Sequence, residues 1–278
     1  MKIAWLSEGG YTGVVPREKT LNAGVLWAWM ANLKSFHYPI LNFNHAPTNE
    51  YDYVILQIPK SPGVREQLFN KDIVKEARRI AKKVLFFQEG PVWVYQDMPL
   101  EWQFWHYNVL VDVDLIFCEN ETDIPYYRGF VPGKPVINLN DLIIDDYIKE
   151  TRNIPKQNKA IIGGNFCRWY GGFDSYIIAQ EFDCPLYAPS MGRKIEGEEQ
   201  ISDLTHLPFM PWGEWMHKLA EFKYGIHLMQ TFAAGSFMMN CGYLEAMTNF
   251  DKYYSETNFN TWKNDFFPNL DNFIKNFK

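Results

Sequence analysis

Glycines that directly follow short apolar runs are the residues of this chain best suited to binding a phosphate-bearing ligand. Gly9, Gly10 and Gly13 come after the apolar run Lys2–Ser7 and before a predicted helix. Glycine lets the backbone approach a ligand closely, and the N-terminus of a helix favours an anion. The segment matches neither a dinucleotide fingerprint nor a phosphate-binding loop with its lysine. We therefore predict either an acceptor or phosphate loop, or a plain turn from strand to helix.

A second glycine-rich stretch, residues 163–172, follows the apolar run Ala160–Ile162 and contains four glycines and one arginine. Gly164 and Asn165 lie near its start, and Arg168 lies in its middle. A guanidinium at this position can clamp a diphosphate through paired hydrogen bonds. The alternative interpretation is a solvated arginine in an ordinary loop.

Small residues open a third candidate segment, where Gly235 and Ser236 precede Phe237 at the start of a predicted helix. The first turn of a helix has free N–H groups, and Ser236 either caps the helix or bonds a phosphate oxygen. Glu245 follows about two and a half helical turns later. It would reach a ribose if it faces the ligand, and it is otherwise a solvated glutamate.

A general base is predicted at Glu89, which follows the apolar run Lys83–Gln88. This carboxylate is our candidate catalytic residue, and an ordinary loop glutamate is the alternative. His45, His106 and His227 are the other candidates. Their predicted places in a loop, a helix and a buried strand favour a solvated or structural histidine in each case.

Alternating strands and helices must position these residues. The predicted strands are Lys2–Ser7, Tyr38–Phe43, Tyr51–Ile58, Lys83–Gln88, Leu115–Glu119 and Val136–Leu139, and the predicted helices are Thr20–Leu33, Gly63–Lys82, Leu100–Val111 and Thr122–Arg128. Such alternation predicts an α/β fold with parallel strands and right-handed crossovers. Ligands of such folds bind in the crevice at the carboxyl ends of the strands.

The polar segment Ile144–Lys159 interrupts this pattern and predicts a linker. The alternation then resumes, with strands at Ala160–Ile162, at Pro185–Ala188, within Leu204–Met210 and at Tyr224–Met229, and with helices at Phe173–Phe182, at Trp212–Phe222 and from Ser236 to about Met247. We therefore predict two Rossmann-like domains, residues 1–150 and 151–278.

The second half resembles the donor-binding domain of the GT-B glycosyltransferases that carry a Leu-Glu-Ala-Met signature. The resemblance covers residues 160–247, and Glu245 lies within that signature. In the family's glycine-rich pattern Gly-Arg-Leu-x-x-x-Lys-Gly, Gly164 and Gly171 fall on the two glycines. Asn165 falls on the arginine and Tyr170 on the lysine.

The same family places two glutamates eight positions apart. Glu245 matches the second, which the resemblance assigns to the nucleotide ribose, and Phe237 stands at the first. The resemblance implies a hexosyltransferase-like enzyme whose two domains face each other across a cleft, with the donor side in the second domain and the acceptor side in the first. It would move a sugar from a nucleoside diphosphate to a hydroxyl of a glycan, lipid or small molecule, without a cofactor or metal.

Two other functions compete with this one. A non-catalytic sugar- or nucleotide-binding protein of the same fold would suit the departures at Asn165 and Phe237. An oxidoreductase with a dinucleotide cofactor is disfavoured because the glycine fingerprint is missing.

The composition excludes several classes of protein. The 278 residues carry a net charge of −6, which disfavours nucleic-acid binding. No apolar run approaches the ~18 residues that a membrane span needs. The four cysteines have no zinc-site spacing and predict free thiols in a cytoplasmic protein. Asp112 and Asp114 precede a strand instead of following one, so we predict no metal site.

Overall fold

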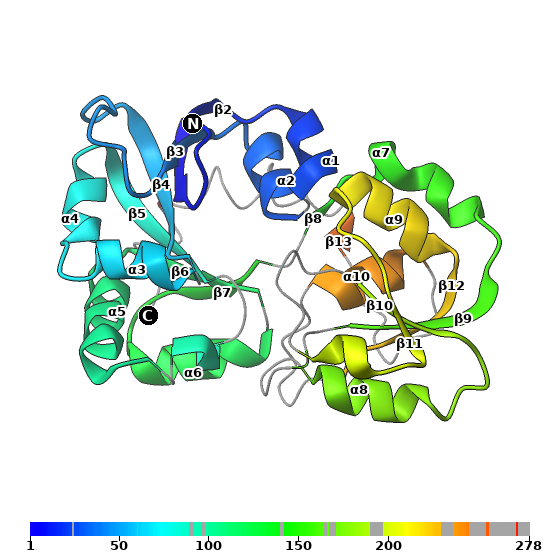
Figure 1. The fold of residues 1–278 in the computed structure, drawn as a ribbon. Coiled ribbons are helices and arrows are strands. Elements are labelled where there is room, and N and C mark those ends of the chain that lie inside the picture. Colours follow the sequence, from blue (N-terminus) through cyan, green and yellow to red (C-terminus); the bar gives the residue numbers. More distant parts are fainter. Residues whose placement is uncertain are drawn as a thin grey trace. The chain divides into compact units, whose positions relative to one another are not determined.

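The computed structural model describes residues 1–23, 25–59, 61–88, 92–95, 98–119, 121–139, 142–163, 166, 171–189, 197–228, 236–244, 254–255 and 271. The chain divides into two compact units (Figure 1). Among the described residues, the first unit comprises those of Met1–Arg17 and Trp29–Asn140 together with Asp271, and the second comprises those of Glu18–Ala28 and Asp141–Thr257. Residues Glu18–Ala28 therefore belong to the second unit, although the residues on both sides of them belong to the first. The chain returns to the second unit after Asn140.

The first unit is built on a seven-stranded sheet. Its order is β2 (Gly13–Val14), β3 (Phe36–Pro39), β1 (Ile3–Ser7), β4 (Tyr51–Gln57), β5 (Ala81–Gln88), β6 (Leu115–Cys118) and β7 (Val136–Asn138). All neighbours pair in parallel except β2 and β3. The central strands contain continuous buried apolar runs, such as Tyr53–Leu56 in β4 and Val84–Phe87 in β5, as expected of a parallel sheet that is covered on both faces.

The helices between residues 17 and 130 are mostly short, and those within Glu18–Ala28 belong to the second unit. They are η1 (Arg17–Lys19), α1 (Thr20–Ala23), α2 (Val25–Asn32), α3 (Pro62–Leu68), α4 (Ile73–Arg78), η2 (Val92–Tyr95), α5 (Leu100–Asp112), η3 (Glu121–Asp123) and α6 (Ile124–Phe130). Buried residues of α3, α4, α5 and α6 form one core with alternate residues of β1, β4, β5 and β6, such as Leu6, Val54 and Phe86. This core packs against one face of the sheet and thereby keeps the ends of the strands in position.

The predicted helix Gly63–Lys82 is wrong as a single element. Phe69 leaves the helical conformation with a ψ of 136°, and Asn70 adopts a φ of 72°. Asp72 then caps α4 by accepting a hydrogen bond from the Lys75 N–H at 3.0 Å. Asparagine tolerates the left-handed conformation and aspartate favours the N-cap, so local polar residues override the continuous apolar spacing.

The second unit is built on a four-stranded parallel sheet in the order β11 (Leu204–His206), β10 (Leu186–Ala188), β9 (Gln157–Ile162) and β12 (Phe222–Ile226). Its helices are α7 (Asp145–Ile148), η4 (Lys149–Asn153), α8 (Gly172–Ala179), η5 (Glu198–Gln200), α9 (Trp212–Ala220) and α10 (Ser236–Tyr243). A parallel pair, β8 (Leu142–Ile143) and β13 (Tyr254–Ser255), completes it. The α/β fold class with two Rossmann-like units is thus confirmed.

The predicted linker at 144–159 is wrong. Residues of α7 and η4 are helical, and β9 begins inside the segment, at Gln157. Ile148 is buried in the core of the second unit. The Arg152 guanidinium lies 4.1 Å from the centre of the Tyr243 ring and donates a hydrogen bond to the Tyr243 carbonyl. A few apolar anchors among polar residues are enough to dock this segment, which is why its composition resembled a linker.

Each sheet has one point where the strand order reverses. In the first sheet β3 lies on one side of β1, and β4 to β7 follow on the other. In the second sheet β10 and β11 lie on one side of β9, and β12 lies on the other. Ligands of open α/β sheets bind beyond the carboxyl ends of the strands at such switch points. The two candidate ligand sites are therefore the loop after Ser7 and the loops after β9 and β12.

Candidate functional site

The loop after β1 presents open backbone at the first switch point. Gly9 has a φ of 116°, a left-handed conformation that favours glycine. A Cβ placed on Gly9 or Gly10 would meet no atom within 4 Å. Within the described part of the chain, neither amide N–H donates a hydrogen bond. The predicted acceptor or phosphate loop therefore has space and two donors, whereas binding itself stays a prediction.

Gly13 has a different environment from Gly9 and Gly10. It starts β2 with a φ of 143°, and a Cβ there would lie 3.2 Å from the Tyr11 hydroxyl oxygen. That hydroxyl donates a hydrogen bond to the Val14 carbonyl at 2.7 Å. The need for glycine at this position follows from the tight turn into β2.

His37 anchors this loop to the sheet. Its Nδ1 lies 2.6 Å from the carbonyl oxygen of Tyr11, and its Nε2 lies 2.7 Å from the Oγ of Ser7. The Tyr11 ring also stacks on the imidazole at 6.2 Å between centroids. Both Ser7 and His37 are buried. The histidine thus connects the end of β1 with the far side of the glycine loop.

The second switch point is packed around Phe237. A Cβ on Gly163 would lie 2.4 Å from Cδ1 of the Phe237 ring, so the ring rests directly on this glycine. The edge of His227, which follows β12, meets the same ring at 5.7 Å and 87°. Ser236 begins α10, as predicted. Phe237, which the resemblance placed at the donor site, is half-buried and packs against the core of the second unit.

A buried serine joins the two loops at this switch point. The Oγ of Ser175 accepts a hydrogen bond from the Leu228 N–H at 2.8 Å and donates one to the Gly171 carbonyl at 2.7 Å. Gly171 has a φ of 63° and stands immediately before α8. The start of α8 and the segment after β12 are therefore held together at the carboxyl edge of the sheet.

Six predicted site residues lie outside the described residues: Glu89, Gly164, Asn165, Arg168, Gly235 and Glu245. Glu89 directly follows β5 in the sequence, and Gly164 and Asn165 are the second and third residues after β9. Their roles stay predictions.

The alternative histidines lie in separate environments. His45 is exposed and meets the Tyr38 ring edge-on at 5.5 Å. His106 is buried and stacks on Tyr95 with 3.6 Å between centroids. Burial, and secondarily the Arg65 guanidinium, lowers the pKa of His106 to about 3, so this imidazole is neutral at pH 7. A base that stays deprotonated so strongly is a poor proton acceptor, which favours a structural role.

Protein donors surround the Asp114 carboxylate. The Asp114 carboxylate accepts hydrogen bonds from Arg78 at 2.9 Å, Lys83 at 3.2 Å and the Val84 N–H at 2.8 Å. Burial alone would raise the pKa of Asp114, but these donors outweigh it and lower the pKa. Among the described residues, no cluster of three histidine, cysteine or acidic side chains has metal-binding geometry. Cys118, Cys184 and Cys241 are free thiols, as predicted.

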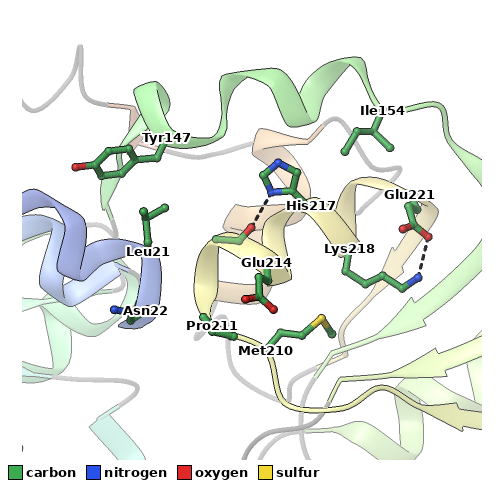
Figure 2. A pocket seen from close by; sticks show the side chains of 11 residues that line it. Leu21, Asn22, Tyr147, Ile154, Met210, Pro211, Glu214, His217, Lys218 and Glu221 are labelled. Atoms are coloured by element: carbon green, nitrogen blue, oxygen red, sulfur yellow. Dashed lines mark hydrogen bonds and ion pairs between the residues drawn. The ribbon is translucent and has the colours of Figure 1, made fainter.

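A groove of about 650 Å³ also lies within the second unit (Figure 2). It is lined by Leu21, Asn22, Tyr147, Ile154, Met210, Pro211, Gly213, Glu214, His217, Lys218 and Glu221. Its charged residues lie along one face of α9. His217 Nδ1 is bonded to the Gly213 carbonyl at 2.9 Å, and Lys218 pairs with Glu221 at 3.0 Å. The charges are largely satisfied within the helix, so the groove lacks the converging donors that a diphosphate needs.

Glu221 has a second partner on the sheet. The Lys159 ammonium, whose side chain is 9% exposed, also donates to the Glu221 carboxylate and lies 4.5 Å from the centre of the Phe222 ring. Burial alone raises the pKa of Glu221, but its hydrogen bonds from Lys159 and Lys218 lower it overall. The pair is a structural link between β9 and the end of α9.

Solved structures similar to this chain include a sucrose-phosphate synthase and TarM. No protein-family model and no curated protein sequence matches the chain. A sucrose-phosphate synthase from Thermosynechococcus elongatus is 11% identical over 69% of this chain and 54% of its own, with a TM-score of 0.48. TarM is 9% identical over 82% of this chain and 49% of its own, also with a TM-score of 0.48. The chain spans about half the length of each of these proteins. No helix among the described residues is long and apolar enough to cross a membrane.

Sequence reasoning missed the Ser7–His37 pair. Serine and histidine thirty positions apart give no motif. The signal would have been the strand register, which pairs Trp5 with His37. The predicted strand Tyr38–Phe43 began too late, since β3 starts at Phe36, and it therefore left His37 outside the sheet.

Proposed function

We propose that this protein is a glycosyltransferase that moves a sugar from a nucleoside diphosphate to an acceptor hydroxyl. One observation carries the proposal. The two segments that the sequence predicts as donor-binding, 163–172 and 233–237, follow β9 and β12, and these strands are neighbours at the switch point of the second sheet. In chain order these segments follow two neighbouring strands, and this order supports a shared donor site at the edge where α/β folds bind nucleotides.

On the donor side, the N-terminus of α10 would face the diphosphate, with Ser236 as cap or ligand. Arg168 would balance the phosphate charge as it develops on the leaving group. Glu245 would bind the ribose. These roles rest on the residue types and on the resemblance of residues 160–247 to the GT-B family.

On the acceptor side, the open loop at Gly9 and Gly10 supports a role for the first unit, and Glu89 is the residue that follows β5 in the sequence. The acceptor would be a hydroxyl of a glycan, lipid or small molecule. We propose catalysis without a metal or cofactor, by a cytoplasmic protein.

A second candidate function is a non-catalytic sugar- or nucleotide-binding protein. The observation that favours it is the packing of Phe237. Its ring rests on Gly163 at the position where the resemblance places an acidic residue. Such a site would bind a nucleotide without the carboxylate that the family carries there.

Calorimetric titration with UDP, GDP and their sugars tests the proposal. We expect saturable binding, together with transfer of the sugar to an acceptor or its slow hydrolysis. Arg168→Ala should weaken binding about tenfold or more, since a charged hydrogen bond contributes roughly 1.5–3 kcal/mol. Arg128→Ala, an exposed arginine on α6, is the matched control. Absence of any nucleotide binding would refute the proposal, and binding without turnover would favour the second candidate.

A further inference from the structure

The helix α5 is apolar on two sides. Val109 and Leu110 pack into the core of the first unit. Four other side chains, at positions i, i+4, i+7 and i+11, line up along a second side of the helix and are 36–64% exposed: Leu100, Phe104, Tyr107 and Val111. Single exposed apolar residues are ordinary, whereas a continuous stripe of them indicates a surface that binds another molecule.

Two exposed rings of α6 extend this stripe. The ring of Phe130 meets that of Tyr107 edge-on with 5.0 Å between centroids, and Tyr126 stacks on Phe130 at 5.5 Å. We define the α5–α6 face as Leu100, Phe104, Tyr107, Val111, Tyr126 and Phe130. At about 200 Å² for a large side chain, the exposed parts of these six amount to roughly 500 Å² of apolar surface. Apolar patches of this size on a single chain are often functional.

The charges of α5 favour a protein over a membrane as the molecule that covers this face. Helices that lie on membranes carry lysine and arginine along their polar side. The polar side of α5 has Glu101, Gln103, Asn108 and Asp112, and the helix contains no lysine or arginine. A surface of anionic lipids would repel these carboxylates. Aromatic residues with few charges among them are instead typical of the centre of a protein interface.

The area of the face suits one half of a symmetric dimer. A specific interface buries at least about 1,000 Å² in total, counted over both partners. Two copies of the α5–α6 face supply about that area from their apolar side chains alone, and the polar residues at the edges add to it. In a symmetric dimer the same surface is used by both copies, so one face is sufficient.

The two edges of the face carry opposite charges. Glu101 lies about a quarter of a turn around α5 from the apolar stripe, on the side away from Tyr107 and therefore away from α6. On α6, Arg128 lies on the opposite side of the buried Tyr127 from Tyr126, and thus on the outer edge of the face. Both charged side chains are exposed. The face therefore has an acidic edge along α5 and a basic edge along α6.

This charge distribution selects one arrangement of two copies. The helices α5 and α6 run in the same direction, because they connect β5 to β6 and β6 to β7, which are parallel neighbours. A two-fold axis parallel to both helices would lay the α5 stripe of one copy on the α6 rings of the other. It would also bring Arg128 of each copy next to Glu101 of the other. An axis across the helices would set like edges against each other, which costs binding energy.

We propose that the α5–α6 face binds a second copy of this chain, in a symmetric dimer whose two-fold axis runs parallel to α5. Each contact across the interface then occurs twice, so that one substitution changes two contacts. The inference concerns residues of the first unit alone and is independent of the proposed function.

Sedimentation equilibrium of the full chain tests the dimer, with a reversible monomer–dimer equilibrium of micromolar Kd as the expected result. Phe104→Asp places a charge in the middle of the face and should raise this Kd by about thirtyfold or more, as loss of a central aromatic anchor does. Phe173→Asp is the matched control, because Phe173 is a similarly exposed phenylalanine (57% against 61%) on α8 of the second unit. It should leave the Kd unchanged, and circular dichroism should show that both variants are folded.

A charge exchange tests the arrangement of the two copies. Arg128→Glu and Glu101→Arg should each raise the dimer Kd by about tenfold, because each change sets like charges against one another at two places. The double variant restores the attraction with the signs exchanged, and its Kd should return to within about threefold of the parent value. A double variant that dimerises no better than the single variants would overturn the proposed two-fold arrangement.

Three further results would overturn the inference. The first is a full chain that stays monomeric at every concentration. The second is a Phe104→Asp variant that dimerises as tightly as the parent, or a Phe173→Asp variant that loses the dimer to the same extent. The third is a monomer that sediments with vesicles of phosphatidylcholine and phosphatidylglycerol and ceases to do so after Phe104→Asp, which would assign the face to a membrane.

Discussion

Gly163→Ala tests the packing of the second switch point. The new Cβ would lie 2.4 Å from Cδ1 of Phe237 and 2.8 Å from its Cγ, whereas ordinary contact begins at 3.4 Å. The ring must therefore move by about 1 Å. Because Cγ is the ring atom nearest the backbone, the whole side chain has to shift. It is held by the edge of His227 at 5.7 Å and by Trp215 at 6.5 Å.

Overpacking of this kind costs about 1–3 kcal/mol. We expect Gly163→Ala to lower the free energy of unfolding by that amount in urea titrations followed by circular dichroism. Gly10→Ala is the control, since nothing lies within 4 Å of its Cβ and its φ is not left-handed. That variant should be neutral, or stabilising by about 0.5 kcal/mol through the unfolded state.

A double-mutant cycle with Phe237→Ala isolates the contact. Removing the ring should make the further change Gly163→Ala cost less than about 0.5 kcal/mol, giving a coupling of at least 1 kcal/mol. Equal costs of Gly163→Ala with and without the ring would refute the packing described for this edge. Full stability of Gly163→Ala alone would refute it too.

Three further predictions concern one buried and two half-buried ionisable groups. Burial lowers the pKa of His106 from 6.5 to about 3, so the unfolded chain binds a proton that the folded chain does not, and stability should fall from pH 6.5 toward 3. His106→Phe should reduce this fall in pH-dependent urea titrations, and an unchanged pH dependence would contradict the burial. Asp114→Asn should cost about 1–3 kcal/mol in the same assay, because it weakens three hydrogen bonds. Glu221→Gln should cost a similar ~1–3 kcal/mol by leaving the buried Lys159 ammonium without a carboxylate. The exposed Glu214→Gln should cost less than ~0.5 kcal/mol, and equal losses for all three carboxyl variants would contradict both assignments.

The strands of this fold could be predicted from sequence because parallel strands are buried on both faces. Apolar runs such as Tyr53–Leu56 in β4 and Val84–Phe87 in β5 favour burial on both faces of a sheet. Helix boundaries were harder to predict from the sequence. The break between α3 and α4 at Phe69, for example, depends on the conformation of the neighbouring Asn70. The entry of Glu18–Ala28 into the second unit could not be predicted, because it depends on long-range packing such as that of Leu21 on Gly213.

In the candidate site, too, the features with a local sequence signal could be predicted, whereas those that depend on long-range packing could not. Glycine turns are local signals, and Gly9, Gly10 and Gly163 do lie at strand ends next to the switch points. The Ser7–His37 hydrogen bond depends on the register of two strands, which no local pattern specifies. The ring of Phe237 likewise rests on Gly163 only because β9 and β12 are neighbours.

The central claim is that a nucleoside diphosphate binds at the carboxyl edge of β9 and β12. Amide hydrogen exchange of the full chain, with and without UDP or GDP, tests it most directly. The account predicts slower exchange on ligand addition in residues 163–175 and 227–244, with little change along the groove face of α9. Protection confined to α9, or no change with either nucleotide at saturating concentration, would contradict it.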